Sequence, residues 1–439
     1  MSRLLLLALL LLTGCTSYAD RVRTVRSSFY ANNLSIAELE IDKSLEKKRG
    51  ESDVLKLEKA LVALADGRAK ESETILREVR DRFDYLEQKS AAEGVLSFLS
   101  DDNAQSYAGE DYEKVLIRAF LAISNLMHDG GDAEAYSLQV ADKQQQIIQA
   151  AVTEDGKNPK ANYQQVALGP YLRAALTEEK HRDFDDLKRS REMVVNWQPE
   201  FASGRVDLER AVYGRHSEPG NGVLYVMTLV GRGPYKEEVA EIPSQAALLI
   251  ADRIISATGK HTLPPTIAPI KVPKVVPQIN LIRSVNVSID GEQRGQTETI
   301  TDVGRMAVEQ YEAVYPQIVA KAVVRRIVKK GVVYGAKEVM GVQKGSLTSF
   351  ALDAAGVVWE ATENGDTRCW GLLPDKIQVL RVELPAGEHE IDLQPIARHD
   401  RLSGGVVNQK FTIRDGGNTY LLANFPDTKL VGNVLVSDR

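Results

Sequence analysis

Long hydrophobic runs are missing from this chain after its N-terminal segment. No later stretch has the roughly 18 uninterrupted apolar residues that a transmembrane helix needs. A surplus of positive charge is also missing. The formal net charge is −6, whereas nucleic-acid-binding domains are usually strongly basic, so we expect no nucleic-acid partner. The composition, 43% hydrophobic and 26% charged, is that of a globular protein, and 439 residues suffice for two or three domains.

The motifs of common catalytic and metal sites are missing as well. The chain has six histidines, but none forms an HxxxH pair or lies near a cysteine at metal-site spacing. There is no P-loop, no GxSxG elbow and no HExxH sequence. We therefore expect no metal, no cofactor and no enzymatic activity. A glycosidase-like pair of carboxylates stays open, because such a pair is defined in space and not in sequence.

The first 15 residues contain the three parts of an export signal. Arg3 supplies a positive start, residues 4–12 are apolar, and Leu12-Thr13-Gly14-Cys15 follows with small residues before a cysteine. This apolar run is too short to span a bilayer, which needs about 20 residues. It also lacks the polar face expected of a core helix. The tetrad resembles the lipobox of bacterial lipoproteins, which implies signal-peptidase cleavage before Cys15, a diacylglycerol on its thiol and an acylated N-terminus.

The lipobox resemblance also sets expectations for location and for the second cysteine. Several acyl chains on one residue would anchor the protein stably. Thr16 stands where an aspartate tends to retain lipoproteins in the inner membrane, so we expect the outer membrane, facing the periplasm. Once Cys15 is acylated, Cys369 is the remaining thiol and has no partner for an internal disulfide. We expect Cys369 to be buried and unreactive.

Residues 17–200 are expected to be helical. Glycine and proline are sparse there, and apolar residues recur every three or four positions. Breaks at Asp66-Gly67 and at residues 129–132 separate helix pairs, and a third pair covers residues 160–176 and 183–197. Acidic pairs such as Glu178-Glu179 are interpreted as solvated helix surface. The stacked hairpins resemble tetratricopeptide repeats, which implies a groove suited to peptides or partner helices. No strict period emerges, so a plain bundle is the alternative.

The character of the chain changes near residue 200. Residues 222–230 predict a strand, and the prolines between residues 264 and 277 predict an extended linker or edge strand, because proline cannot donate to a ladder. Residues 201–280 thus form a strand-containing segment with a Pro-rich linker. Residues 281–439 predict an α+β domain with a strand at 284–290, a helix at 302–339 and a C-terminal antiparallel sheet. The predicted fold class is α+β, a helical-hairpin solenoid followed by a β-rich domain with an inserted long helix.

The helix at 302–339 has two interpretations. Between residues 313 and 337 it carries Lys and Arg residues and no acidic residue. Its basic face could lie on anionic lipid. Alternatively, the helix connects two parts of the molecule, with its Val, Ile and Ala residues packed inside. We favour the connector, because apolar residues surround much of its circumference.

A cluster with a tryptophan precedes the first C-terminal strand. Asp366, Arg368 and Trp370 lie within five positions of one another, and Trp370 is one of three tryptophans in the chain. The simpler interpretation is a structural hinge in which Arg368 pairs with an acid and Trp370 covers a core. The functional interpretation is a partner-binding site, because Trp and Arg dominate such sites.

Five short stretches together carry a family resemblance. Residues 107–116, 131–132, 231–236, 366–374 and 384–389 resemble a family of uncharacterised bacterial lipoproteins with N-terminal helical repeats. The family has no established activity and is associated with envelope lipoproteins that regulate penicillin-binding proteins. This chain departs from the family pattern at residues 136–143, which lack the usual arginine pair.

These observations predict a lipid-anchored, non-enzymatic scaffold. It would bind envelope proteins, including those of cell-wall synthesis, through a helical-repeat groove. The alternative is a protein that binds cell-wall glycan or acts on peptidoglycan, suggested by the β-rich part and the expected periplasmic location.

Overall fold

The computed structural model describes residues 18–47, 50–93, 106–153, 156–258, 268–339 and 365–437. Cys15 and the preceding Leu12, Thr13 and Gly14 lie outside the described residues. Within the described ranges, no helix combines the length and apolar character needed to cross a bilayer. The chain is a mixed α+β protein with a helical N-terminal region and β-sheets in its C-terminal region, which confirms the predicted class at that level.

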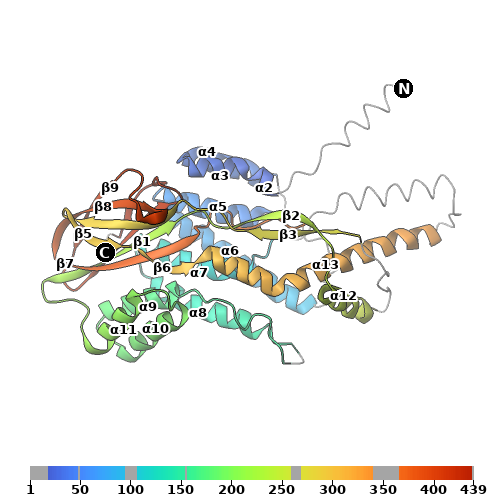
Figure 1. The fold of residues 1–439 in the computed structure, drawn as a ribbon, viewed down its shortest axis with the longest axis horizontal. Helices are drawn as coiled ribbons and strands as arrows, with labels where there is room; N and C mark the ends of the chain where they lie inside the picture. The colour runs from blue at the N-terminus through green and yellow to red at the C-terminus, as the bar shows by residue number, and fades with distance from the viewer. Residues whose placement is uncertain are drawn as a thin grey trace, which may run out of the picture.

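The helical region consists of helices that pack against their neighbours in sequence (Figure 1). The three predicted pairs are present, α3 and α4 add a fourth at the N-terminal end, and α11 extends the region beyond residue 200. Gly67, at φ +90°, makes the predicted turn between α5 and α6. The helices are α2 (Tyr18–Arg21), α3 (Arg23–Tyr30), α4 (Leu34–Leu45), α5 (Ser52–Ala65), α6 (Ala69–Glu93), α7 (Asp111–Leu126), α8 (Ala133–Gln149), α9 (Leu168–Glu179), α10 (Phe184–Trp197) and α11 (Ser203–Tyr213).

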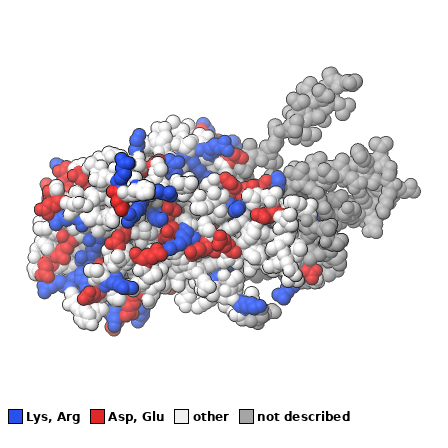
Figure 2. Space-filling view, in the orientation of Figure 1, with Lys and Arg blue, Asp and Glu red and all other residues white. Residues whose placement is uncertain are grey.

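Helices α5, α7 and α9 form the inner layer of this region. In α7, every residue from 115 to 126 is buried, because its sequence is apolar on nearly all sides. Charged side chains on the outer surface pair between helices, as Lys56 of α5 does with Glu78 of α6 at 2.6 Å. Figure 2 shows basic and acidic side chains intermixed over one face of the molecule, without a large area of one sign.

Two sheets follow the helices as further layers. Sheet A has the order β11-β10-β1-β7-β6, and sheet C has the order β5-β4-β8-β9. The strands of sheet A are β1 (Asn221–Val230), β6 (Glu298–Asp302), β7 (Lys376–Pro385), β10 (Asn418–Phe425) and β11 (Leu435–Val436). Those of sheet C are β4 (Ile282–Ile289), β5 (Glu292–Gln296), β8 (Gly387–Ala397) and β9 (Val407–Ile413).

The central strand β1 is buried on both faces. Val223, Tyr225 and Met227 share one core with the inner helices. Leu224 and Val226 point to the opposite face, where they pack against the inner side of sheet C. A strand that is enclosed in this way needs a continuous apolar run, as found at residues 223–227.

The pairing of β1 corrects two predictions. Strand β1 comes from the range 201–280 but lies hydrogen-bonded between β10 and β7, both from the range 281–439. The two ranges therefore share one sheet, and no domain boundary separates them near residue 280. The C-terminal strands also do not form one antiparallel sheet. They are divided between sheets A and C, and β10 runs parallel to β1.

An arm extends from the sheets toward the opposite end of the molecule (Figure 1). It contains β2 (Tyr235–Glu241), α12 (Gln245–Thr258), β3 (Ile270–Val276) and α13 (Val303–Val339). Pro273 lies in β3, which pairs only with β2, as expected for an edge strand. Residues 319–324 of α13 pack against α12 and β3. This packing agrees with the connector interpretation for the described side chains, which end at residue 328.

Candidate functional site

The predicted Asp366, Arg368 and Trp370 lie together in the interior. Both carboxylate oxygens of Asp366 accept hydrogen bonds of 2.8 Å from Arg368, whose Nη1 also donates to the carbonyl of Gly50 at 2.8 Å. Trp370 is 0% exposed and packs on Phe120, with 5.4 Å between ring centroids. These are the contacts expected of a structural hinge, and they leave the Trp370 ring no surface to offer a partner.

Two buried carboxylates hold this segment against the helices. Glu113 Oε1 accepts the backbone N–H of Trp370 at 2.7 Å, and the two oxygens of Glu58 accept those of Gly371 and Leu372 at 2.9 and 2.8 Å. Glu58 and Glu113 are both 0% exposed. Burial raises the pKa of Glu58 to about 7 and also raises that of Glu113.

The inner helix faces therefore bind the chain's own peptide. Glu58 belongs to α5 and Glu113 to α7, and apolar residues of both helices share a core with sheet A. The predicted groove for a partner peptide is filled by the segment from residue 366 to 373 and by the sheet. Sequence reasoning missed Glu58 and Glu113, because a glutamate in a helix does not reveal in sequence that it accepts distant backbone donors.

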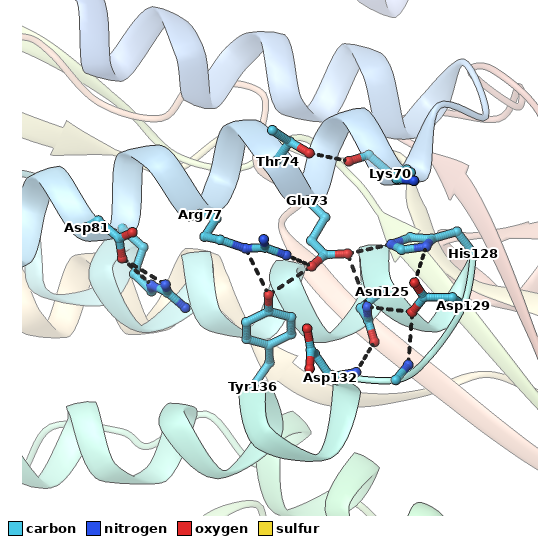
Figure 3. Close-up of polar contacts among 12 residues, drawn as sticks. Lys70, Glu73, Thr74, Arg77, Asp81, Asn125, His128, Asp129, Asp132 and Tyr136 are labelled. Atoms are coloured by element: carbon cyan, nitrogen blue, oxygen red, sulfur yellow. Dashed lines mark hydrogen bonds and ion pairs between the residues drawn. The ribbon is translucent and has the colours of Figure 1, made fainter.

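A second polar network surrounds Glu73 of α6 (Figure 3). Glu73 Oε1 accepts the Tyr136 hydroxyl at 2.8 Å and a short hydrogen bond from Arg77, while Oε2 accepts Asn125 Nδ2 at 3.1 Å and contacts His128 Nε2. Burial alone raises the pKa of Glu73, but these hydrogen bonds outweigh burial and lower it.

The Glu73 network also stabilises the loop between α7 and α8. His128 Nδ1 lies 3.3 Å from Asp129, and Asp129 Oδ1 accepts the backbone N–H of Gly131 at 2.9 Å, so the loop between α7 and α8 is tied to α6. A carboxylate–imidazole–carboxylate row can also move protons in catalysis, and in nucleophilic catalysis of the triad type the imidazole activates a serine or cysteine beside it. Among the described contacts of Figure 3, no serine or cysteine touches His128.

The strongest candidate for a ligand site is a polar cleft of about 540 Å³ where the α10–α11 connection meets both sheets. Gln378 fixes its base, because Nε2 donates to the carbonyl of Arg283 in β4 at 2.8 Å and to Thr299 Oγ1 in β6 at 3.1 Å. The lining residues are Gln198, Glu200, Gln278, Asn280, Ile282, Arg283, Ser284, Gln296, Thr297, Glu298, Thr299, Asp302, Asp375, Lys376, Gln378 and Arg398.

Two carboxylates converge in the polar cleft. Lys376 Nζ lies 3.5 Å from Asp302 Oδ2 and 3.6 Å from Asp375 Oδ2. Burial raises the pKa of Asp375, and the neighbouring charge of Asp302 adds to the rise. Asp302 also accepts the backbone N–H of Arg305 at 2.9 Å and so caps the first turn of α13. Asp302 and Asp375 therefore make stabilising contacts within the protein, in addition to any contact with a ligand.

Cys369 is 1% exposed, and burial raises the pKa of its thiol, which fits the prediction of an unreactive cysteine. In the part of the chain that the structure describes, no three His, Cys, Asp or Glu side chains are grouped to hold a metal ion. Comparison of this chain with protein-family models, with curated proteins and with solved structures finds no match.

Proposed function

We propose that this chain is a lipid-anchored, non-enzymatic binding protein of the cell envelope that takes a glycan in the polar cleft. The signal-like N-terminus and Cys15 support the anchor and the outer-membrane location. The helical hairpins, interpreted as irregular tetratricopeptide-like repeats, serve as a frame around the sheets. Residues 366–373 and the sheet cover the inner faces of these helices. We therefore assign ligand binding to the polar cleft and not to a helical groove.

The lining of the polar cleft carries this proposal. Ile282 is the one aliphatic hydrocarbon side chain among the described lining residues. Five side-chain amides and three hydroxyls line it. Some already bond within the chain, as Gln278 does to the Gly233 carbonyl at 2.8 Å, and the remaining donors and acceptors suit a ligand with many hydroxyl and acetamido groups. Four acidic and three basic side chains nearly balance, which favours an uncharged ligand over a phosphate. A cell-wall glycan has this chemistry.

Binding is favoured over hydrolysis. A glycosidase needs one carboxyl free to donate a proton and one carboxylate free to act as base or nucleophile. In the polar cleft, Lys376 lies beside both Asp302 and Asp375, and Asp302 is used as a helix cap. Catalysis would have to break these contacts.

A protein partner is the second candidate, and α11 favours it. Val206 and Tyr213 are 64% and 86% exposed on this last helix of the helical region. The terminal helix of a stacked array normally presents a polar outer face. An envelope protein could cover these two side chains while the glycan occupies the polar cleft.

Co-sedimentation with purified peptidoglycan tests the glycan proposal. The full chain in neutral detergent should sediment with peptidoglycan, and Gln296→Ala, an exposed change on the rim of the polar cleft, should weaken this at least several-fold. Gln245→Ala, an exposed change on α12 outside the cleft, is the matched control. Absence of binding contradicts the glycan proposal, and release of soluble muropeptides shows an enzyme instead.

A further inference from the structure

A second cavity, of about 670 Å³, lies between the N-terminal helices and the start of β2. Its lining includes four cationic side chains, Arg23, Arg26, Arg232 and Lys236. Three acidic side chains, Asp20, Glu237 and Glu238, also line it, so what distinguishes it from the polar cleft is how its cations are paired and not its net charge. We refer to it as the Arg26 cavity.

Arg26 has no acidic partner. Among the described residues, its one side-chain hydrogen bond runs from Nη2 to the Cys369 thiol at 3.7 Å, and its buried Nε has no acceptor. No carboxylate in the described ranges lies within ion-pair distance of it. The nearby Glu58 already accepts two backbone N–H groups. Burial disfavours the charged guanidinium, but Cys369, Glu58 and two tyrosines outweigh burial and raise the pKa of Arg26, so it stays charged. An external anion would add a direct ion pair, which no described residue supplies.

The other charges that line the Arg26 cavity are engaged elsewhere. Lys236 pairs with Glu110, and Arg23 pairs with Asp20 at 2.5 Å. Arg232 lies over the Tyr30 ring at 4.3 Å and reaches Asp427 only at 3.6 Å.

The acidic residues at this cavity are also satisfied. Glu237 accepts the Tyr235 hydroxyl at 2.8 Å, and Glu238 pairs with Lys271 at 2.9 Å and accepts the Gly365 N–H at 2.7 Å. Among the described residues that line the cavity, Arg26 is thus the cation without a carboxylate at ion-pair distance.

The position of Arg26 is fixed by the segment it touches. A Cβ on Gly371 would lie 2.0 Å from Arg26 Nη2 and 2.3 Å from both Cζ and Nε, so the guanidinium lies flat against the Gly371 backbone. Tyr30, one turn further along α3, donates from its hydroxyl to the Gly371 carbonyl at 3.2 Å. The guanidinium is therefore pre-organised, which lowers the entropy cost of binding an anion.

We propose that the Arg26 cavity binds a phosphate group, with Arg26 as the donor and with Arg23 and Arg232 as nearby cations that keep their partners within the chain. A guanidinium carries a fixed positive charge and several N–H donors, and charge-assisted hydrogen bonds from such donors to phosphate oxygens are strong. The phosphate belongs either to a free anion or to an anionic lipid headgroup. The lipid source rests on the proposed anchor, because Tyr18 follows Cys15 by three residues, a span of at most about 11 Å.

Calorimetric titration of the full chain in neutral detergent tests this proposal. The probes are inorganic phosphate and dihexanoyl phosphatidylglycerol. Arg26→Gln should weaken binding of whichever probe binds by at least tenfold, and Arg26→Lys, which keeps the charge but not the planar donor pair, should lie between. Arg205→Gln removes an exposed arginine of α11 outside the cavity and should change nothing.

The two probes separate the sources. Tighter binding of phosphatidylglycerol identifies a lipid headgroup, and tighter binding of inorganic phosphate identifies a free anion. The proposal is overturned if the folded wild-type chain binds neither probe saturably, or if Arg26→Lys and any folded Arg26→Gln bind as tightly as wild type. Peptidoglycan binding at the polar cleft is independent of this outcome and reports separately on the proposed function.

Discussion

The backbone N–H of Trp370 donates a 2.7 Å hydrogen bond to Oε1 of Glu113, a residue 257 positions earlier in the chain. Both residues are 0% exposed. This bond joins the segment before β7 to helix α7 of the helical region. We therefore expect the helical region and the sheets to unfold as one cooperative unit, which several substitutions can test.

Trp370→Ala should destabilise the whole protein by about 3–5 kcal/mol, because it removes a fully buried aromatic ring that packs on Phe120. Urea unfolding followed by circular dichroism measures this loss. Phe184→Ala, at a ring that is 64% exposed, is the aromatic control and should cost little. A Trp370→Ala protein of unchanged stability would instead favour the partner-binding interpretation.

Glu58 should make stability fall as the pH rises. Burial first of all raises its pKa in the folded protein from 4.5 to about 7. The folded state then holds a proton that the unfolded chain has released, so the contribution is complete below pH 4.5 and is lost as the pH rises through about 7. This rise of the pKa from 4.5 to about 7 corresponds to about 3 kcal/mol in the free energy of unfolding.

Urea titrations of Glu58→Gln between pH 4.5 and 7.5 measure this effect. The variant should lack the pH dependence that comes from Glu58. Its free energy of unfolding should fall by about 1–3 kcal/mol, because one amide replaces two acceptor oxygens and leaves a backbone N–H unpaired. Glu209→Gln, an exposed change on α11, should follow the wild-type pH profile. Parallel profiles for wild type and Glu58→Gln would contradict a raised pKa.

The sequence predicted where helices and strands lie better than it predicted which strands pair with one another. The three helix pairs, the edge strand with Pro273 and the long α13 follow from local patterns of apolar residues, glycine and proline, which act over a few positions. The parallel pairing of β1 with β10 joins residues almost 200 positions apart. No local pattern specifies that choice, because a run buried on both faces fits the centre of many sheets.

Buried acidic residues were the hardest features to predict. Glu178 was interpreted as solvated surface, but it is 5% exposed and accepts Arg191 Nη2 at 2.9 Å. Glu58 and Glu113 likewise serve distant backbone donors. An acidic residue within a helix has the same sequence signature whether it faces water or a partner from another element. The polar cleft is assembled from five separate stretches of chain, so its lining was also invisible in sequence.

Glu73 should show the opposite pH dependence to Glu58. Its pKa is lowered, because its hydrogen bonds outweigh burial, so its contribution is present above about pH 4.5 and is lost as the pH falls through the lower folded value. Glu73→Gln should cost about 1–3 kcal/mol at pH 7 and less in acid. Glu78→Gln, on the exposed side of the same helix, is the control. If the loss of stability in Glu73→Gln stays constant down to pH 3, the charge of Glu73 does not cause that loss.

Gly432→Ala should cost more than Gly416→Ala, although both glycines have a positive φ, of +78° and +68°. Each alanine pays about 1–2 kcal/mol for the left-handed backbone. A Cβ on Gly432 would also lie 1.9 Å from the carbonyl oxygen of Ala65, whereas nothing lies within 4 Å at Gly416. That carbonyl is held in place, because it accepts the Asn433 N–H at 2.8 Å. The additional overpacking adds about 1–3 kcal/mol. Thermal unfolding of both variants gives the difference directly. Equal losses would mean that the end of α5 and the C-terminal segment separate without cost, and that the closed arrangement of helices and sheets does not depend on this contact.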